Sequence, residues 1–110
     1  MAEFEEVQIG VARLRDLIAQ GAVVDMLDVR EPWEHKICLI AESQAIPMGE
    51  LQQRTKELTT EKPLVVICHH GMRSFHATLW LRSQGFDNAV NLEGGIDAWA
   101  REIDPSMQRY

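Results

Sequence analysis

A run of apolar residues in the middle of the chain, "PLVVIC" at positions 63–68, constrains the fold more than any other feature. Leucine, two valines and isoleucine follow one another without a polar residue, so the run predicts a strand that is covered on both faces. A helical pattern follows over 74–84, and Gly85 is suited to cap its end. A buried strand followed by a well-buried helix is typical of a parallel sheet.

The same alternation extends over the rest of the chain. Strands are predicted at "VQI" (7–9), "AVVDMLDV" (22–29) and "AVNL" (89–92), and helices at 11–18, within 48–58 and at 94–102. The segment 30–47 is expected to be irregular, because Pro32 and Pro47 interrupt it. The pattern predicts one α/β domain over 1–110, with a core at about 7–103 and helices on both faces of a mainly parallel sheet.

Composition limits the classes of function. The chain has 110 residues, 45% of them hydrophobic, and a formal net charge of -6, which fits one folded domain and disfavours nucleic-acid binding. A local basic site for a small anion is compatible with an acidic surface. Two cysteines are too few for a disulfide-stapled secreted domain, so both are expected to be reduced in a cytoplasmic protein. The acidic N-terminus is not expected to be a leader peptide, and no run reaches the ~20 apolar residues of a membrane helix.

The strand at 63–68 ends in "CHHGMRS" (68–74), directly before the helix. In parallel α/β folds, ligands bind at the carboxyl ends of the strands, which is where Cys68 stands. The helix N-terminus, the Arg73 guanidinium and a loop able to curl at Gly71 would each favour a thiolate on Cys68. The sequence therefore predicts an anion-binding cradle with a nucleophilic cysteine at its base. A merely buried cysteine at a strand end is the alternative.

The histidines are less informative. His69 and His70 are expected to line the rim of the cradle and to contribute backbone N–H groups rather than act as general bases, because no carboxylate partner is identifiable. The other two histidines are expected to be surface or packed residues. A metal site that combines His35 and Cys38 with residues 68–70 is disfavoured, since adjacent residues leaving a strand point in different directions.

Four segments carry a family likeness: "LDVREPWE" (27–34), "AIP" (45–47), "VVICHHGMRS" (65–74) and "NLEGGIDAW" (91–99). In order and spacing they resemble the single-domain rhodanese-like sulfurtransferases, and the likeness spans nearly the whole chain. The resemblance implies a rhodanese-like α/β fold with a central, mainly parallel five-stranded sheet and helices on both faces. It also implies sulfur transfer without a metal or an organic cofactor.

The resemblance makes Cys68 the catalytic residue. Cys68 would take a sulfane sulfur as a persulfide and pass it to a thiophilic acceptor such as cyanide or a thiol. The donor would be a small anion such as thiosulfate, or a persulfide-carrying protein, and neither nucleic acid nor a membrane is an expected partner. The residues expected to bind the persulfide and the donor follow the nucleophile directly: His69, His70, Gly71, Met72 and Arg73.

Other residues shared with the family are interpreted as structural. Residues 28–31, "DVRE", are expected to anchor the end of a strand and the loop after it, through a salt bridge or backbone hydrogen bonds. Gly94 and Gly95 are expected to meet the backbone requirements of a turn before a helix. Three tryptophans are expected to pack in or near the core: Trp33, Trp80 and Trp99.

One segment departs from the family pattern. Before the Ile-Pro, the family often has Gly-His-Ile, a small residue, and then Gly-Ala or Gly-Ser. Here the segment is "CLIAESQAIP" (38–47), with Cys38 and Leu39 at the Gly-His positions and Glu42 at the second glycine. The departure is expected to affect the conformation of this loop and the shape of one pocket wall, but not the nucleophile loop.

Two other functions compete with sulfur transfer. A Cys-based phosphatase of related fold would have five residues between its cysteine and arginine, whereas four, 69–72, separate Cys68 from Arg73 here. The shorter loop encloses a space suited to a sulfur atom, and it contains no aspartate to serve as a general acid. A non-catalytic regulatory or docking module is the second alternative, and the presence of Cys68 argues against it.

Overall fold

The computed structural model describes residues 6–110, which are built around a five-stranded sheet with every neighbouring pair of strands parallel. The strand order is β1-β5-β4-β2-β3. The strands are β1 (Gln8–Ile9), β2 (Asp25–Asp28), β3 (Gln44–Ala45), β4 (Leu64–Ile67) and β5 (Ala89–Leu92). The predicted buried strand is therefore the central one, and the predicted α/β architecture with a five-stranded, mainly parallel sheet is confirmed.

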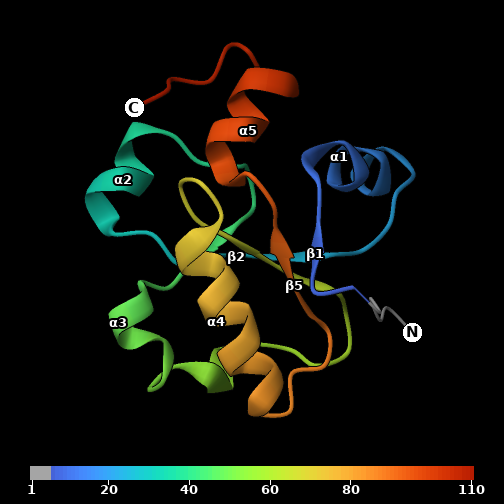
Figure 1. Ribbon diagram of the computed structural model, residues 1–110, viewed down its shortest axis with the longest axis vertical. Helices are drawn as coiled ribbons and strands as arrows, with labels where there is room; N and C mark the ends of the chain where they lie inside the picture. Colours follow the sequence, from blue (N-terminus) through green and yellow to red (C-terminus); the bar gives the residue numbers. More distant parts are fainter. Residues whose placement is uncertain (1–5) are drawn as a thin grey trace.

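Helices cover both faces of this sheet (Figure 1). They are α1 (Val11–Ala19), α2 (Pro32–Ile37), α3 (Met48–Leu51), α4 (Met72–Ser83) and α5 (Gly95–Glu102), with a 3₁₀ turn at Thr55–Glu57. Because side chains alternate along a strand, Val65 and Ile67 pack with residues of α1 and α5, whereas Leu64 and Val66 pack with residues of α4. Cys68 continues this alternation on the α4 side.

The expectation of an irregular segment over 30–47 is wrong, because this segment contains α2 and β3. Pro32 begins α2 instead of breaking it, since a proline in the first turn removes only an N–H group that has no helical partner. Glu31 and Glu34 form a reciprocal capping box around this start, in which the Glu31 N–H donates to Glu34 Oε1 at 3.0 Å. A local signal for a helix was therefore present.

The tryptophans do not share one environment. Trp99 is 9% exposed and belongs to the core beneath α1 and α5, and Trp80 packs partly buried against the core on the α4 side. Trp33 is 60% exposed on α2, so the expectation of core packing is wrong for this residue. Among the described residues 6–110, no helix has the length and apolar character that would let it cross a membrane.

Candidate active site

The loop between β4 and α4, drawn in yellow in Figure 1, holds Cys68 at the carboxyl end of the central strand. Cys68 is 1% exposed, and three donors surround its Sγ atom. These are the Gly71 N–H at 3.1 Å, the Ser74 N–H at 3.3 Å and the Ser74 hydroxyl at 3.2 Å. Met72 opens α4 and is 68% exposed, so its side chain lies largely in solvent.

Gly71 gives this loop its curl. Its φ of +98° lies in the left-handed region, which glycine adopts without steric cost. A Cβ atom at this position would lie only 3.0 Å from the Gly94 nitrogen. The structure therefore agrees with the predicted curl at Gly71, and it adds close packing as a second reason for the glycine.

The first turn of α5 holds the same loop in place through backbone hydrogen bonds. The Ile96 N–H donates to the Cys68 carbonyl at 2.9 Å, and the Asp97 N–H donates to the His69 carbonyl at 3.0 Å. Gly95 has a φ of +62°, and a Cβ there would lie 2.5 Å from the His69 carbonyl oxygen. Gly95 is thus required both by its turn, as predicted, and by contact with the backbone of the nucleophile loop.

Sequence reasoning missed two polar residues beneath the sulfur, Ser74 and Asn91. Both are fully or almost fully buried, and the Ser74 hydroxyl contacts Asn91 Oδ1 as well as Cys68 Sγ. Asn91 Nδ2 donates to the Gly71 carbonyl at 3.1 Å. A hydroxyl has a single proton, so Ser74 donates either to Asn91 or to Cys68. The place of Ser74 in the first turn of the helix was an available signal, whereas Asn91 comes from a distant strand.

Arg73 has a different partner from the one expected. Its guanidinium makes two 2.7 Å hydrogen bonds to the carboxylate of Glu34. Glu34 is 2% exposed, while the Arg73 side chain is 40% exposed. The Arg73 hydrogen bonds are the main reason that the pKa of Glu34 falls to about 2. Arg73 is therefore the outer member of an ionised pair, and Glu34 is a site residue that sequence reasoning missed.

A second ion pair fixes the loop that carries Glu34. The guanidinium of Arg30 is fully buried and contacts both oxygens of Asp28, with Nη2 to Oδ2 at 2.7 Å. The same guanidinium donates to the carbonyls of Cys38 at 2.7 Å and Glu34 at 3.3 Å. These contacts tie the end of β2 to both ends of α2, in agreement with the predicted structural role of "DVRE".

His69 and His70 lie at the rim, as expected, with half-buried and exposed side chains respectively. Their rings stack at 3.9 Å between centroids, and burial, followed by the neighbouring His70, lowers the pKa of His69. Candidate metal-ligand atoms of His69, His70 and Asp97 lie within 4.8 Å of one another. Asp97 also pairs with two arginines, which already balance its charge. Asp97 is therefore a carboxylate close to both histidines, which the sequence analysis could not identify.

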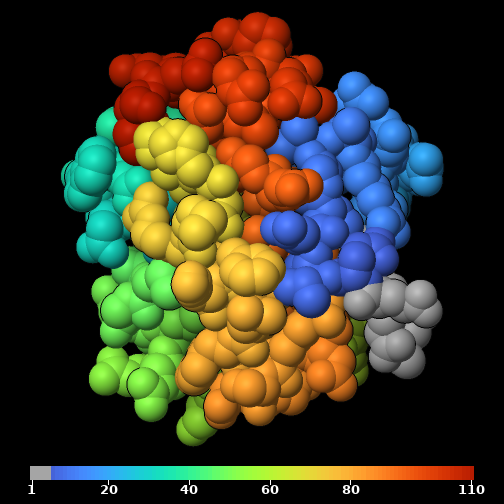
Figure 2. All heavy atoms as spheres, viewed as in Figure 1, coloured from blue at the N-terminus to red at the C-terminus, as the bar shows by residue number. Residues whose placement is uncertain are grey.

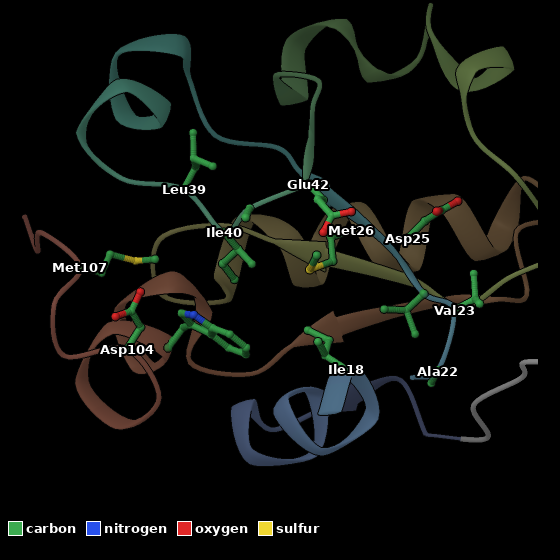
Figure 3. Close-up of a pocket in the computed structure, with 13 residues that line it drawn as sticks. Ile18, Ala22, Val23, Asp25, Met26, Leu39, Ile40, Glu42, Asp104 and Met107 are labelled. Atoms are coloured by element: carbon green, nitrogen blue, oxygen red, sulfur yellow. The ribbon is translucent and has the colours of Figure 1, made fainter. Parts of the chain in front are cut away.

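The atypical loop shapes a pocket elsewhere in the molecule (Figure 3). Glu42 has a φ of +71°, in the left-handed region that glycine adopts without steric cost. Leu39 and Glu42 line a pocket of about 640 Å³ together with Met26 and Trp99. No residue of 68–74 lines this pocket. The atypical segment thus lines a pocket that is separate from the nucleophile loop.

Comparison with known proteins agrees with this geometry. Residues 10–102 match the rhodanese-like domain, and the chain belongs to this family. It is 36% identical over 98 residues to the putative sulfurtransferase YtwF of Bacillus subtilis, covering 89% of this chain and 94% of that protein. The crystal structure of a rhodanese-related protein from Thermoplasma volcanium matches with a TM-score of 0.78 at 40% identity, covering 89% of this chain and 94% of the other.

Some relatives are much longer than this chain. The probable adenylyltransferase/sulfurtransferase MoeZ of Mycobacterium tuberculosis is 35% identical over 99 residues, but the chain covers only 25% of it. The shared part is therefore one domain of a larger protein in that case. Names that include sulfurtransferase recur among both the short and the long relatives.

Proposed function

We propose that this protein is a sulfurtransferase that carries a sulfane sulfur as a persulfide on Cys68. The observation that supports this proposal most strongly is the convergence of two backbone N–H groups, with the Ser74 hydroxyl beside them, on one buried sulfur atom. Hydrogen bonds of this kind favour the thiolate, which is the nucleophilic form of cysteine. The names of relatives that the chain covers almost fully support the same class of reaction.

The reaction has two steps. The Cys68 thiolate attacks the outer sulfur of thiosulfate, a new S–S bond forms, and the S–S bond of thiosulfate breaks as sulfite leaves with its electron pair. A nucleophilic acceptor then attacks the outer sulfur of the persulfide, which releases the Cys68 thiolate. With cyanide as the acceptor the product is thiocyanate. Since Cys68 is 1% exposed, its surroundings favour a small donor over a bulky one.

The residues of the loop have separate roles in this proposal. Backbone N–H groups of His69 to Arg73 hold the persulfide, and those of Met72 and Arg73 have no acceptor within the helix because they lie in its first turn. Arg73 attracts the anionic donor. A guanidinium has five N–H bonds, and among the described residues two of them go to Glu34, which leaves others for the donor.

Mass spectrometry of the intact protein tests this proposal. After incubation with thiosulfate, the wild type should gain the mass of one sulfur atom, and dithiothreitol should remove it. Cys68→Ser should abolish the gain, while Cys38→Ser, the matched control at the other cysteine, should retain it. Sulfur bound to Cys38 would show the site assignment to be wrong. Cys68-dependent hydrolysis of an aryl phosphate faster than sulfur transfer would favour a phosphatase instead.

A further inference from the structure

The segment after α5 returns to the rim of the active site. In Figure 1 this segment, 103–110, ends beside α2, and in Figure 2 its atoms (red) adjoin those of α2 (cyan) next to the nucleophile loop (yellow). Met107 packs against the core beneath α1 and α5, and Arg109 pairs with Asp97 at 3.2 Å. These contacts place the side chain of Tyr110 between α2 and the residue that follows Cys68.

The hydroxyl group of Tyr110 joins the two ion pairs of the site. It accepts a hydrogen bond from Arg30 Nη1 at 3.0 Å and donates one to Glu34 Oε2 at 2.7 Å. The same carboxylate binds Arg73, so an unbroken chain of hydrogen bonds runs from the buried Arg30 to the half-exposed Arg73. The Tyr110 hydroxyl is a donor at neutral pH in any case, and burial raises its pKa further, to about 12.

The ring of Tyr110 makes equally close contacts. It stacks on the His69 imidazole with 3.8 Å between centroids and an angle of 5° between the ring planes. The ring of Trp33 meets it edge to face at 6.0 Å. Stacked and edge-to-face rings hold one another in a fixed geometry. Tyr110 therefore forms a rigid wall at the His69 side of the cradle.

We propose that Tyr110 is a positioning and specificity-determining residue of the sulfur-transfer site. Its hydroxyl fixes Glu34, which in turn holds the Arg73 guanidinium where an anionic donor meets it, and its ring limits the size of the donor that passes His69. This inference rests on the proposed sulfurtransferase function. It assigns a role in the site to a residue far from the nucleophile loop in sequence.

Tyr110→Phe tests the role of the hydroxyl, because phenylalanine keeps the stacked ring and loses both hydrogen bonds. The first measurement is protection of Cys68 from iodoacetamide by sulfite, the first product, which needs no turnover. The sulfite concentration for half protection and the KM for thiosulfate should each rise about three- to tenfold, with kcat and the unprotected alkylation rate nearly unchanged. Gln108→Ala, a control at an exposed position of the same segment that leaves these bonds in place, should match the wild type.

Tyr110→Ala tests the role of the ring. Benzenethiosulfonate donates its outer sulfur to the thiolate as thiosulfate does, and benzenesulfinate leaves with the electron pair. The ratio of kcat/KM for benzenethiosulfonate to kcat/KM for thiosulfate should rise about tenfold in Tyr110→Ala relative to Tyr110→Phe. A loss of folded protein would lower both values together and leave their ratio unchanged.

The outcomes separate this inference from the proposed function. If thiosulfate leaves no persulfide on wild-type Cys68, the proposed donor is wrong, and sulfite protection still reports whether Tyr110 supports anion binding. Equal half-protection concentrations in wild type and Tyr110→Phe would overturn the positioning role. An unchanged donor ratio in Tyr110→Ala would overturn the role in specificity.

Discussion

The site has two parts that are built in different ways. One is the nucleophile loop around Cys68, and the other is the charged rim, where Glu34 meets Arg73 and Tyr110. Around Cys68, the hydrogen bonds to its sulfur come from Gly71 and Ser74, three and six positions away. At the rim, the side-chain donors to Glu34 are Arg73, 39 positions away, and Tyr110, 76 positions away. A strand, a tight loop and a helix suffice to form the first half, whereas the second needs three distant segments to meet.

The two halves also differ in their electrostatics. The cradle consists of uncharged N–H and O–H donors around a buried atom, and a helix N-terminus adds a partial positive charge. The rim contains full charges that already balance each other, because the Glu34 carboxylate is ionised against Arg73. We infer that the cradle controls the reactivity of the sulfur and the rim controls which donor reaches it. Substitutions on each side should therefore affect different kinetic parameters.

The largest effect is expected where the cradle meets the backbone of α5. In Gly95→Ala the new Cβ would lie 2.5 and 2.6 Å from the carbonyl oxygens of His69 and Cys68, and the positive φ adds strain. We expect a loss of roughly 2 kcal/mol or more in the free energy of unfolding, and near-complete loss of sulfur transfer. Gly49→Ala, with open space around its Cβ, should change stability by less than about 1 kcal/mol. Chemical denaturation measures the stability and thiosulfate kinetics the activity of both variants. A stable and active Gly95→Ala would contradict the prediction, because it would show that the loop tolerates the displacement.

The next largest effect concerns the rim. Arg73→Ala should lower kcat/KM for thiosulfate roughly ten- to a hundredfold, because one charged contact to the donor is worth ~1.5–3 kcal/mol. Arg73→Lys should recover only part of this, since an ammonium group cannot make the forked contact. The alanine variant also leaves Glu34 buried without its cation, which costs stability.

A double variant separates these two consequences of removing Arg73. Arg73→Ala combined with Glu34→Gln removes the unpaired charge, so it should recover stability but not thiosulfate turnover. If turnover returned with stability, Arg73 would be a packing and pairing residue with no role toward the donor. Thermal unfolding by circular dichroism and steady-state kinetics on the same samples provide both readouts.

The sequence was most informative where structure follows from local pattern. The strand predicted over 89–92 has the bounds of β5, and the apolar run ending at Cys68 is the central strand. Period-two alternation also places Cys68 on the α4 side of the sheet. Helix α2 was not predicted, because a proline usually interrupts a helix, although the capping box at Glu31 indicates that a helix begins at Pro32.

Local pattern could not have predicted the rim. Nothing near Arg73 in the sequence indicates that a glutamate 39 positions earlier holds its guanidinium. Tyr110 lies in a segment with no predicted helix or strand, and its place depends on the return of the chain to α2, beside which the C-terminus ends (Figure 1). Asn91 similarly reaches the cradle only because β5 is adjacent to β4. Contacts between distant segments follow from the completed fold, which a single sequence specifies only indirectly.

A smaller effect is expected beneath the sulfur. Ser74→Ala removes the hydroxyl at 3.2 Å from Cys68 Sγ but keeps the Ser74 backbone N–H that also reaches it. The polar group beside the sulfur is lost while two backbone N–H donors remain, so the rate of Cys68 alkylation by iodoacetamide at neutral pH should fall about three- to tenfold. KM for thiosulfate should stay close to that of the wild type, because the rim is untouched. A selective rise in KM would contradict the division between cradle and rim.

The smallest expected effect is the dependence of stability on pH at the rim. The pKa of Glu34 falls from 4.5 to about 2 on folding, first because Arg73 donates to it, with the Glu31 N–H and Tyr110 adding to this. A carboxyl whose pKa is lower in the folded state stabilises the fold above its unfolded value, and the gain is lost as pH falls through the folded value. The stability of the wild type should therefore decline between pH 4.5 and about 2 by more than that of Glu34→Gln, which has no proton to bind.

Urea unfolding of both proteins at pH 5 and at about pH 3 measures this difference. The matched control is Glu50→Gln, which changes an exposed carboxylate beside Arg54. If the wild type and Glu34→Gln lose stability in parallel over this range, the Glu34–Arg73 pair does not hold the rim together.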